Sequence, residues 1–265
     1  MVHKQDLTQP RNLTELLQDE HTLFVCNHSG GKDSQAMQIM LEKIVPAHRL
    51  ITFHADLGEV DWPGTLQHIQ NTINSPLHVV SSKKTFFDIV LHRGMFPSPK
   101  NRQCTSDLKR APIHKQIKAL VNPYKKENQT EKRFYTVVDC VGIRAQESTN
   151  RSKLKPFELK TNLCYGRRSW YQWLPVFDLS KEAVFDMIAS AGQEPHWAYK
   201  EGMSRLSCSF CIMSCQSDIL PAARLRPELL KKYDTIERQI GKSMMMPRKG
   251  KAPERLMQIV ERLNK

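Results

Sequence analysis

The chain has 265 residues, of which 40% are hydrophobic, and a formal net charge of +13. This length suffices for one large α/β domain, or for one domain with a C-terminal extension. No apolar run approaches the ~18 to 20 residues that a membrane span needs, and the N-terminus lacks the apolar region of a signal peptide. Seven cysteines, an odd number, argue against a secreted disulfide framework. We therefore expect a cytoplasmic protein that makes no membrane contact and uses cysteines for metal or redox chemistry.

Two segments carry the whole positive surplus. Residues 100–155 hold 14 Lys and Arg against 5 Asp and Glu, and residues 221–265 hold 12 against 5. The remaining residues hold 14 basic side chains against 17 acidic ones. The alternative is that the positive charge serves only solubility or ATP binding. Charge of that kind would be spread more evenly along the chain. The concentration predicts a polyanionic partner such as nucleic acid.

Strand-like and helix-like patterns alternate through most of the chain. We expect strands at 22–26, 50–56, 77–80, 134–141 and 171–177. We expect helices near 13–17, 33–45, 63–74, 85–92, 104–121 and 181–191, the last with Ser180 as its N-cap. Such alternation predicts an α/β fold, a Rossmann-like parallel sheet with helices on both faces and its ligand at the carboxyl ends of the strands.

Other segments fall outside this alternation. Residues 122–132 are polar and basic and are predicted to form an exposed excursion, and residues 244–251 to form a mobile loop. Residues 203–215 are rich in cysteine, and 227–240 and 253–263 have basic helical patterns. We therefore expect an α/β domain over residues 1–202 and a cysteine-rich, basic helical extension over residues 203–265.

A glycine loop joins the first predicted strand to the helix that follows it. Its sequence is Ser29-Gly30-Gly31-Lys32-Asp33-Ser34. Two adjacent glycines let the backbone approach a ligand closely, and their N–H groups can point at one anion together with those of the first helical turn. Lys32 adds a positive charge and the serines add hydroxyls, so the loop predicts a phosphate site. Its spacing is neither the Walker form nor the dinucleotide fingerprint. A plain glycine-rich turn is the alternative.

Three cysteines, Cys208, Cys211 and Cys215, lie within eight residues. A pair of cysteines two residues apart can bind one metal ion or cluster from a single turn. A further ligand would come from elsewhere, and the possibilities are Cys26, Cys104, Cys140 and Cys164. Spacing alone does not separate zinc from iron–sulfur. Cys26 and Cys140 lie inside predicted strands, where buried apolar thiols are the plainer interpretation.

Taken together, the motifs resemble the PP-loop ATP pyrophosphatase superfamily, and within it the phosphoadenosine-phosphosulfate reductase-like branch. In chain order they are residues 29–34, His54-Ala55-Asp56, Cys104-Thr-x-x-Leu-Lys, Gly142-Ile-Arg-x-x-Glu-Ser, Pro175-Val-Phe-Asp and Cys208-x-x-Cys211. The resemblance implies a HUP-like α/β fold and cleavage of ATP between its α- and β-phosphates with Mg²⁺. It implies a [4Fe–4S] cluster in the iron–sulfur members, with zinc as the alternative.

The resemblance also implies roles for individual residues. Lys32, Asp33 and Ser34 would be catalytic. The nucleotide would be held by Ser29, Gly30, Gly31, Lys32, Asp33, Ser34, Asp56, Gly142 and Arg144. The cluster would be held by Cys104, Cys208, Cys211 and Cys215. For Arg144, with Glu147 and Arg151 beyond it, ion pairing on a helix surface is the alternative.

The sequence departs from the sulfonucleotide reductases at one place. Those enzymes resemble one another in a nucleophilic cysteine near the C-terminus, whereas here no cysteine follows Cys215. The chain therefore resembles more closely the ATP pyrophosphatases of DNA phosphorothioation, the DndC and SspD type, in which sulfur replaces a non-bridging oxygen of the DNA backbone. This implies DNA, a cysteine desulfurase as sulfur donor and other phosphorothioation proteins as partners. The rivals are a reductase or sulfurtransferase that acts on a small sulfonucleotide or on tRNA, and a non-catalytic nucleic-acid-binding adaptor.

Overall fold

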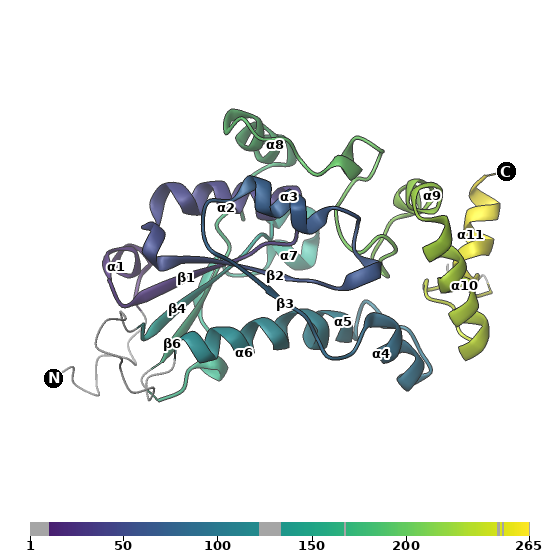
Figure 1. Cartoon of the computed structure of the whole chain (residues 1–265), viewed down its shortest axis with the longest axis horizontal. Helices are drawn as coiled ribbons and strands as arrows, with labels where there is room; N and C mark the ends of the chain where they lie inside the picture. Colours follow the sequence, from purple (N-terminus) through teal and green to yellow (C-terminus); the bar gives the residue numbers. More distant parts are fainter. Residues whose placement is uncertain (1–10, 122–133, 167, 248–249, 251, 265) are drawn as a thin grey trace. The chain divides into compact units, whose positions relative to one another are not determined.

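The computed structural model describes residues 11–121, 134–166, 168–247, 250 and 252–264 (Figure 1). The predicted excursion at 122–132 lies outside these residues, as do 248, 249 and 251 of the predicted loop at 244–251. The chain divides into two compact units. Unit 1 comprises Met1–His54, Leu66–Val79 and Ile113–Pro195, and unit 2 comprises Ala55–Thr65, Val80–Pro112 and His196–Lys265. Residues 203–265 thus share a unit with two segments from earlier in the chain.

A six-stranded sheet with the order β3-β2-β1-β4-β6-β5 lies almost entirely in unit 1. Its strands are β1 (Thr22–Asn27), β2 (Leu50–Ala55), β3 (Leu77–Val80), β4 (Thr136–Val141), β5 (Phe157–Leu159) and β6 (Ser169–Trp173). β1 pairs in parallel with β2 and β4, and β4 pairs in parallel with β6. The short edge strand β5 runs antiparallel to β6. The predicted α/β fold is confirmed, with one unpredicted antiparallel edge.

Helices cover both faces of this sheet. The helices that lie mainly in unit 1 are α1 (Leu13–Gln18), α2 (Lys32–Ile44), α3 (Thr65–Thr72), α6 (Ala111–Leu120), α7 (Thr149–Ser152) and α8 (Lys181–Ser190). Phe24 and Cys26 of β1 share one buried cluster with Met37 of α2 and Ile188 of α8. Figure 1 shows α6 on the opposite side of the strands from α2. Because β1 is covered on both faces, its residues 23–26 are apolar without alternation, which is typical of a central parallel strand.

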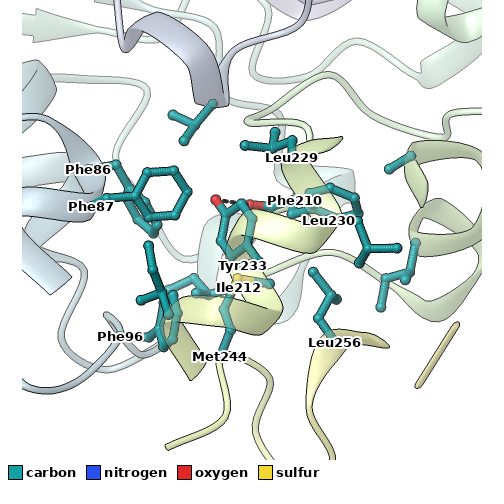
Figure 2. Packing of buried hydrophobic residues seen from close by; sticks show 14 of the residues in the cluster. Phe86, Phe87, Phe96, Phe210, Ile212, Leu229, Leu230, Tyr233, Met244 and Leu256 are labelled. Atoms are coloured by element: carbon teal, nitrogen blue, oxygen red, sulfur yellow. Dashed lines mark hydrogen bonds between the residues drawn. The ribbon is translucent and has the colours of Figure 1, made fainter. Parts of the chain in front are cut away.

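Unit 2 is built around a second core. Its helices are α4 (Phe86–Arg93), α5 (Gln103–Thr105), α9 (Gln216–Leu225), α10 (Pro227–Ile240) and α11 (Leu256–Leu263). Tyr233 of α10 is fully buried, and its ring packs against Phe86, Phe87, Phe96 and Phe210 (Figure 2). Its hydroxyl donates to the Phe210 carbonyl at 3.3 Å. No helix in the described part of the chain is both long and apolar enough to cross a membrane.

Candidate functional site

The glycine loop between β1 and α2 has the backbone shape of an anion site. Gly30 has φ of 79°, in the left-handed region, where the chain turns into the helix. Gly31 is the N-cap of α2, and no side chain caps this end of the helix. A bound anion could therefore accept from the N–H groups of the first turn. Ser34 Oγ donates to the Gly31 carbonyl at 2.8 Å and accepts from the Ser29 N–H at 3.2 Å, so the loop is closed by its own serines.

Two buried cations meet on one carboxylate beside this loop. Asp33 accepts from Lys32 Nζ at 2.7 Å and from Arg144 Nε at 2.6 Å. Lys32 and Arg144 are each only 4% exposed. The structure thus brings together three of the predicted site residues. Lys32 and Asp33 are adjacent in the sequence, and Arg144 lies more than a hundred positions further on. With two positive charges against one negative charge, the cluster has the excess charge that an anionic ligand would complement.

Gly142 lies directly against the first turn of α2. A Cβ atom at this position would lie 2.9 Å from the Ser34 backbone nitrogen and 3.0 Å from the Asp33 carbonyl carbon. Only glycine allows the end of β4 to approach the helix this closely. The chain then continues to Arg144, whose N–H donates to Glu147 Oε2 at 3.0 Å, and Glu147 also pairs with Arg151. An ion pair is therefore present here, between Arg151 and Glu147. The guanidinium of Arg144 contacts Asp33 instead.

Asp56 lies just beyond β2, in unit 2. Its Oδ1 accepts from the Gly58 N–H at 2.8 Å, a local turn contact. Its expected contact with nucleotide or metal stays a prediction. The Pro175-Val-Phe-Asp motif lies in unit 1, where the Phe177 carbonyl accepts from the Ala145 N–H at 2.8 Å. This motif therefore supports the segment that carries Arg144.

His28 is a site residue that the motif analysis did not single out. It follows β1, is 2% exposed, and its Nδ1 accepts from the Gly30 N–H at 3.1 Å. Burial lowers the pKa of His28 to about 3, with smaller contributions from His68 and His54. The sequence does show a titratable side chain between the first strand and the glycine turn. It does not show which atom that side chain contacts.

Three of the predicted cysteine ligands lie together in unit 2. Cys104 on α5 and Cys208 and Cys211 before α9 all pack against the core around Tyr233. The Met213 N–H donates to Cys211 Sγ at 3.4 Å, a contact of the kind that stabilises metal-bound thiolates. Burial, with smaller contributions from Asp61 and the other two thiols, raises the pKa of Cys208 to about 12.

A lysine faces these three thiols. The helix that begins with α5 continues through a π-helical turn, Ser106–Arg110, which carries Lys109. Burial acts to lower the pKa of Lys109, but the negative charges available on Cys208, Asp61 and the other thiols outweigh it, so the pKa is raised. Lys109 in turn favours the thiolate form of Cys208. Three thiols and one cation therefore lie in the same part of unit 2, and the π-helical turn that carries the cation is of a kind frequent at functional sites.

Cys215 has other contacts. It is the exposed N-cap of α9, and its Sγ donates to Asp218 Oδ2 at 3.2 Å. As the side chains stand, no group of three or more His, Cys, Asp or Glu residues in the described ranges is arranged to hold a metal ion. Cys26 and Cys140 are fully buried neighbours on β1 and β4, and burial raises the pKa of both. Their contacts fit the interpretation as apolar core thiols.

Several basic side chains of the C-terminal segment have partners inside unit 2. Their ion pairs are Arg224–Glu201, Lys231–Glu228, Lys232–Glu59, Arg238–Asp234, Arg255–Asp234 and Arg262–Glu254. Arg226 donates to the carbonyls of Asp61 and Glu59 at 2.6 and 2.8 Å. Much of this positive charge is therefore engaged in ion pairs and hydrogen bonds within unit 2. In unit 1, by contrast, Lys115 and Lys118 on α6 are exposed.

A parallel sheet with a glycine loop after its first strand is typical of the α/β folds whose ligands lie at the carboxyl edge of the sheet. A family model described as the phosphoadenosine phosphosulfate reductase domain matches residues 24–214. The chain therefore belongs to this family.

The curated relatives are longer than this chain. An uncharacterized 37.8 kDa protein of Escherichia phage 186 is 28% identical over 156 residues, which are 59% of this chain and 43% of that protein. An uncharacterized protein of Methanocaldococcus jannaschii is 23% identical over 240 residues, 91% of this chain and 54% of that protein. The chain thus spans about half the length of the curated relatives that it matches.

Two solved structures illustrate the similar course of the chain. The phosphoadenylyl-sulfate reductase of Candida auris, a phosphate complex, has a TM-score of 0.48 and 14% identity over 73% of this chain and 86% of that one. The FMN adenylyltransferase of Candida glabrata, in complex with FAD and inorganic pyrophosphate, has a TM-score of 0.43 and 11% identity over 71% of this chain and 55% of that one.

Proposed function

We propose that the protein is an ATP pyrophosphatase that adenylylates a DNA backbone phosphate and so prepares it for sulfur insertion. The observation that carries this proposal is the glycine loop, where an uncapped helix N-terminus lies beside the buried Lys32–Asp33–Arg144 cluster. Membership of the phosphoadenosine phosphosulfate reductase family supports a nucleotide as the ligand.

In the first step the ATP phosphates bind at the N-terminus of α2. Lys32 and Arg144 exchange part of their contact with Asp33 for phosphate oxygens and stabilise the charge that develops on the departing pyrophosphate. The released Asp33 carboxylate is then available to orient the loop or to contact Mg²⁺. An oxygen of the DNA backbone attacks the α-phosphorus, the bond to pyrophosphate breaks, and an adenylylated phosphodiester remains.

In the second step sulfur replaces AMP. A sulfur atom supplied by a cysteine desulfurase partner, together with other phosphorothioation proteins, attacks the phosphorus of the DNA backbone, and AMP leaves. If the sulfur arrives as a persulfide, a further thiol must reduce its S–S bond and is itself oxidised to a disulfide. The chain's part in this step is to hold the activated phosphodiester at the loop and to exclude water from it.

We also propose that Cys104, Cys208 and Cys211 hold a [4Fe–4S] cluster, with zinc as the alternative. Their shared packing against one core and the cation of Lys109 support this assignment. Cys215 can act as the fourth ligand only if its thiol gives up its contact with Asp218. When bound, the cluster would supply iron sites with affinity for sulfur.

Lys115 and Lys118 are the side chains that we propose to contact the DNA backbone, because both are exposed on α6. Replacing both by alanine should weaken DNA binding and lower the slope of log affinity against log salt by about 1 to 2. The matched control replaces Lys231 and Lys232, which are engaged with Glu228 and Glu59. Equal loss in both double variants would contradict the assignment of the contact to α6.

The acceptor is tested by measuring AMP release from ATP with plasmid DNA, tRNA or adenosine phosphosulfate. Stimulation by DNA supports the proposal, whereas stimulation by tRNA favours a tRNA sulfurtransferase. The family match makes a reductase the second candidate, and release of sulfite from the sulfonucleotide would favour it.

Mass spectrometry of DNA nucleosides from cells with and without the gene and its neighbours provides a second test. Phosphorothioate dinucleotides that depend on the gene are expected.

A further inference from the structure

We propose that His28 is a positioning residue that holds the glycine loop in its anion-binding shape through the lone pair of Nδ1. The inference rests on the proposed nucleotide role of the loop and adds a residue to it. The Nδ1 atom accepts from the Gly30 N–H at 3.1 Å. Gly30 is the loop residue with positive φ, so the imidazole holds the chain at the point where it turns.

The backbone of His28 is itself fixed by β2. Its N–H donates to the Phe53 carbonyl at 2.8 Å, and its carbonyl lies 2.9 Å from Nδ1 of His54. Because a carbonyl can only accept, His54 must carry its proton on Nδ1 in this contact. His28 must carry its proton on the other nitrogen, Nε2, because its Nδ1 accepts. The hydrogen bond from Gly30 therefore sets the neutral Nε2–H tautomer of His28.

The ring of His28 leaves a polar atom without a partner. Nε2 is buried and has no hydrogen-bond partner in the described part of the chain. An unsatisfied buried donor is unfavourable, and a leucine would fill similar space without it. The Nδ1 contact is the feature of His28 that an apolar residue lacks. Unfavourable local features of this kind cluster at functional sites. The unsatisfied Nε2 therefore supports a functional role for the Nδ1 contact.

The contact with Gly30 has a consequence for ligand binding. One N–H of the loop is engaged by the imidazole before any anion arrives, and the donors left for the anion are those of the first turn of α2, where no side chain competes. The loop therefore does not have to be ordered by its ligand. A site organised in advance stabilises developing charge without reorganisation during the reaction.

Three substitutions separate the two ring nitrogens. In His28→Asn the side-chain oxygen can accept the N–H two residues ahead, as in an Asx turn. In His28→Gln the polar group lies one bond further out, closer to the place of Nε2, and His28→Leu has no acceptor. We expect His28→Asn to bind inorganic pyrophosphate nearly as the unsubstituted protein does. We expect His28→Gln and His28→Leu to bind it about 2- to 10-fold more weakly, the effect of one hydrogen bond. The same order is expected for kcat/KM with ATP.

Thermal unfolding of all three variants shows whether they fold, and only folded variants enter the comparison. Equal affinity of His28→Leu and the unsubstituted protein for pyrophosphate would overturn the proposal, as would a loss in His28→Asn as large as that in His28→Leu.

A second readout needs no turnover. Long-range ¹H–¹⁵N spectra of histidine-labelled protein report the tautomer, and a proton on Nδ1 of His28 would overturn the proposal whatever the activity. If pyrophosphate binding depends on His28 as described but ATP is not cleaved to AMP, the proposed function fails and the role of His28 stands.

Discussion

Replacing Gly142 by alanine would place a methyl group against the backbone of the first turn of α2. The new carbon would lie 2.9 Å from the Ser34 nitrogen and 3.0 Å from the Asp33 carbonyl oxygen. Ordinary contacts between such atoms begin near ~3.5 Å, so the helix start or the end of β4 must move by about 0.5 Å. Overpacking of this kind costs about 1 to 3 kcal/mol. The atoms that move are those we propose to face the ATP phosphates.

The expected result is a fall in kcat/KM for AMP release of about 5- to 150-fold, because the strain falls on the atoms that would face the transition state. The matched control is Gly192→Ala, because Gly192 has φ of +69° but open space around its missing Cβ. This control should lose stability by about 1 to 2 kcal/mol and keep its activity. Full activity of Gly142→Ala, or a loss in both variants that follows stability alone, would refute the reasoning.

Three further predictions concern charge and thiols. Asp33→Asn leaves two buried cations without their carboxylate and should lower the free energy of unfolding by about 3 to 5 kcal/mol, with partial recovery when pyrophosphate is added; an unchanged urea midpoint would contradict this. After anaerobic reconstitution, Cys104→Ser should lose iron and acid-labile sulfide, whereas Cys215→Ser should lose less and Cys26→Ser none; equal iron in all three would count against the cluster. Burial acts to raise the pKa of Asp234, but its two arginine partners outweigh it and the pKa is lowered from 3.8. Its stabilising contribution is therefore present above about pH 4 and lost as pH falls through the lowered pKa, so Asp234→Asn should flatten the acid side of a plot of urea midpoint against pH.

The sequence patterns predict the parallel sheet and the loop well, and the reason is local. Residues 23–26 are apolar without interruption because β1 is buried on both faces, and the loop's glycines mark the turn directly. Ser180 caps α8 because its hydroxyl accepts from the N–H of Ala183, only three residues further along the chain. Arg144 could be assigned to the loop because its motif matches the family, not because any local signal places it near Asp33.

Features that depend on distant contacts could not be predicted in the same way. β5 has three residues and exists through its pairing with β6. α9 contains Pro221, which argues against a helix interior, and its burial against the core of unit 2 outweighs that preference. The charge of the C-terminal segment predicts a polyanionic partner, which stays a prediction, and charge counts do not show that several of its side chains pair with acidic residues elsewhere in unit 2.

The most direct test of the central claim is the identity of the products that the purified protein forms from ATP, measured by ³¹P NMR. We expect AMP and pyrophosphate, with formation abolished in Lys32→Ala and in Ser34→Ala while Gly192→Ala remains active. Release of ADP and phosphate, or formation of AMP that persists in both loop variants, would contradict the assignment of the glycine loop as the site of cleavage between the α- and β-phosphates.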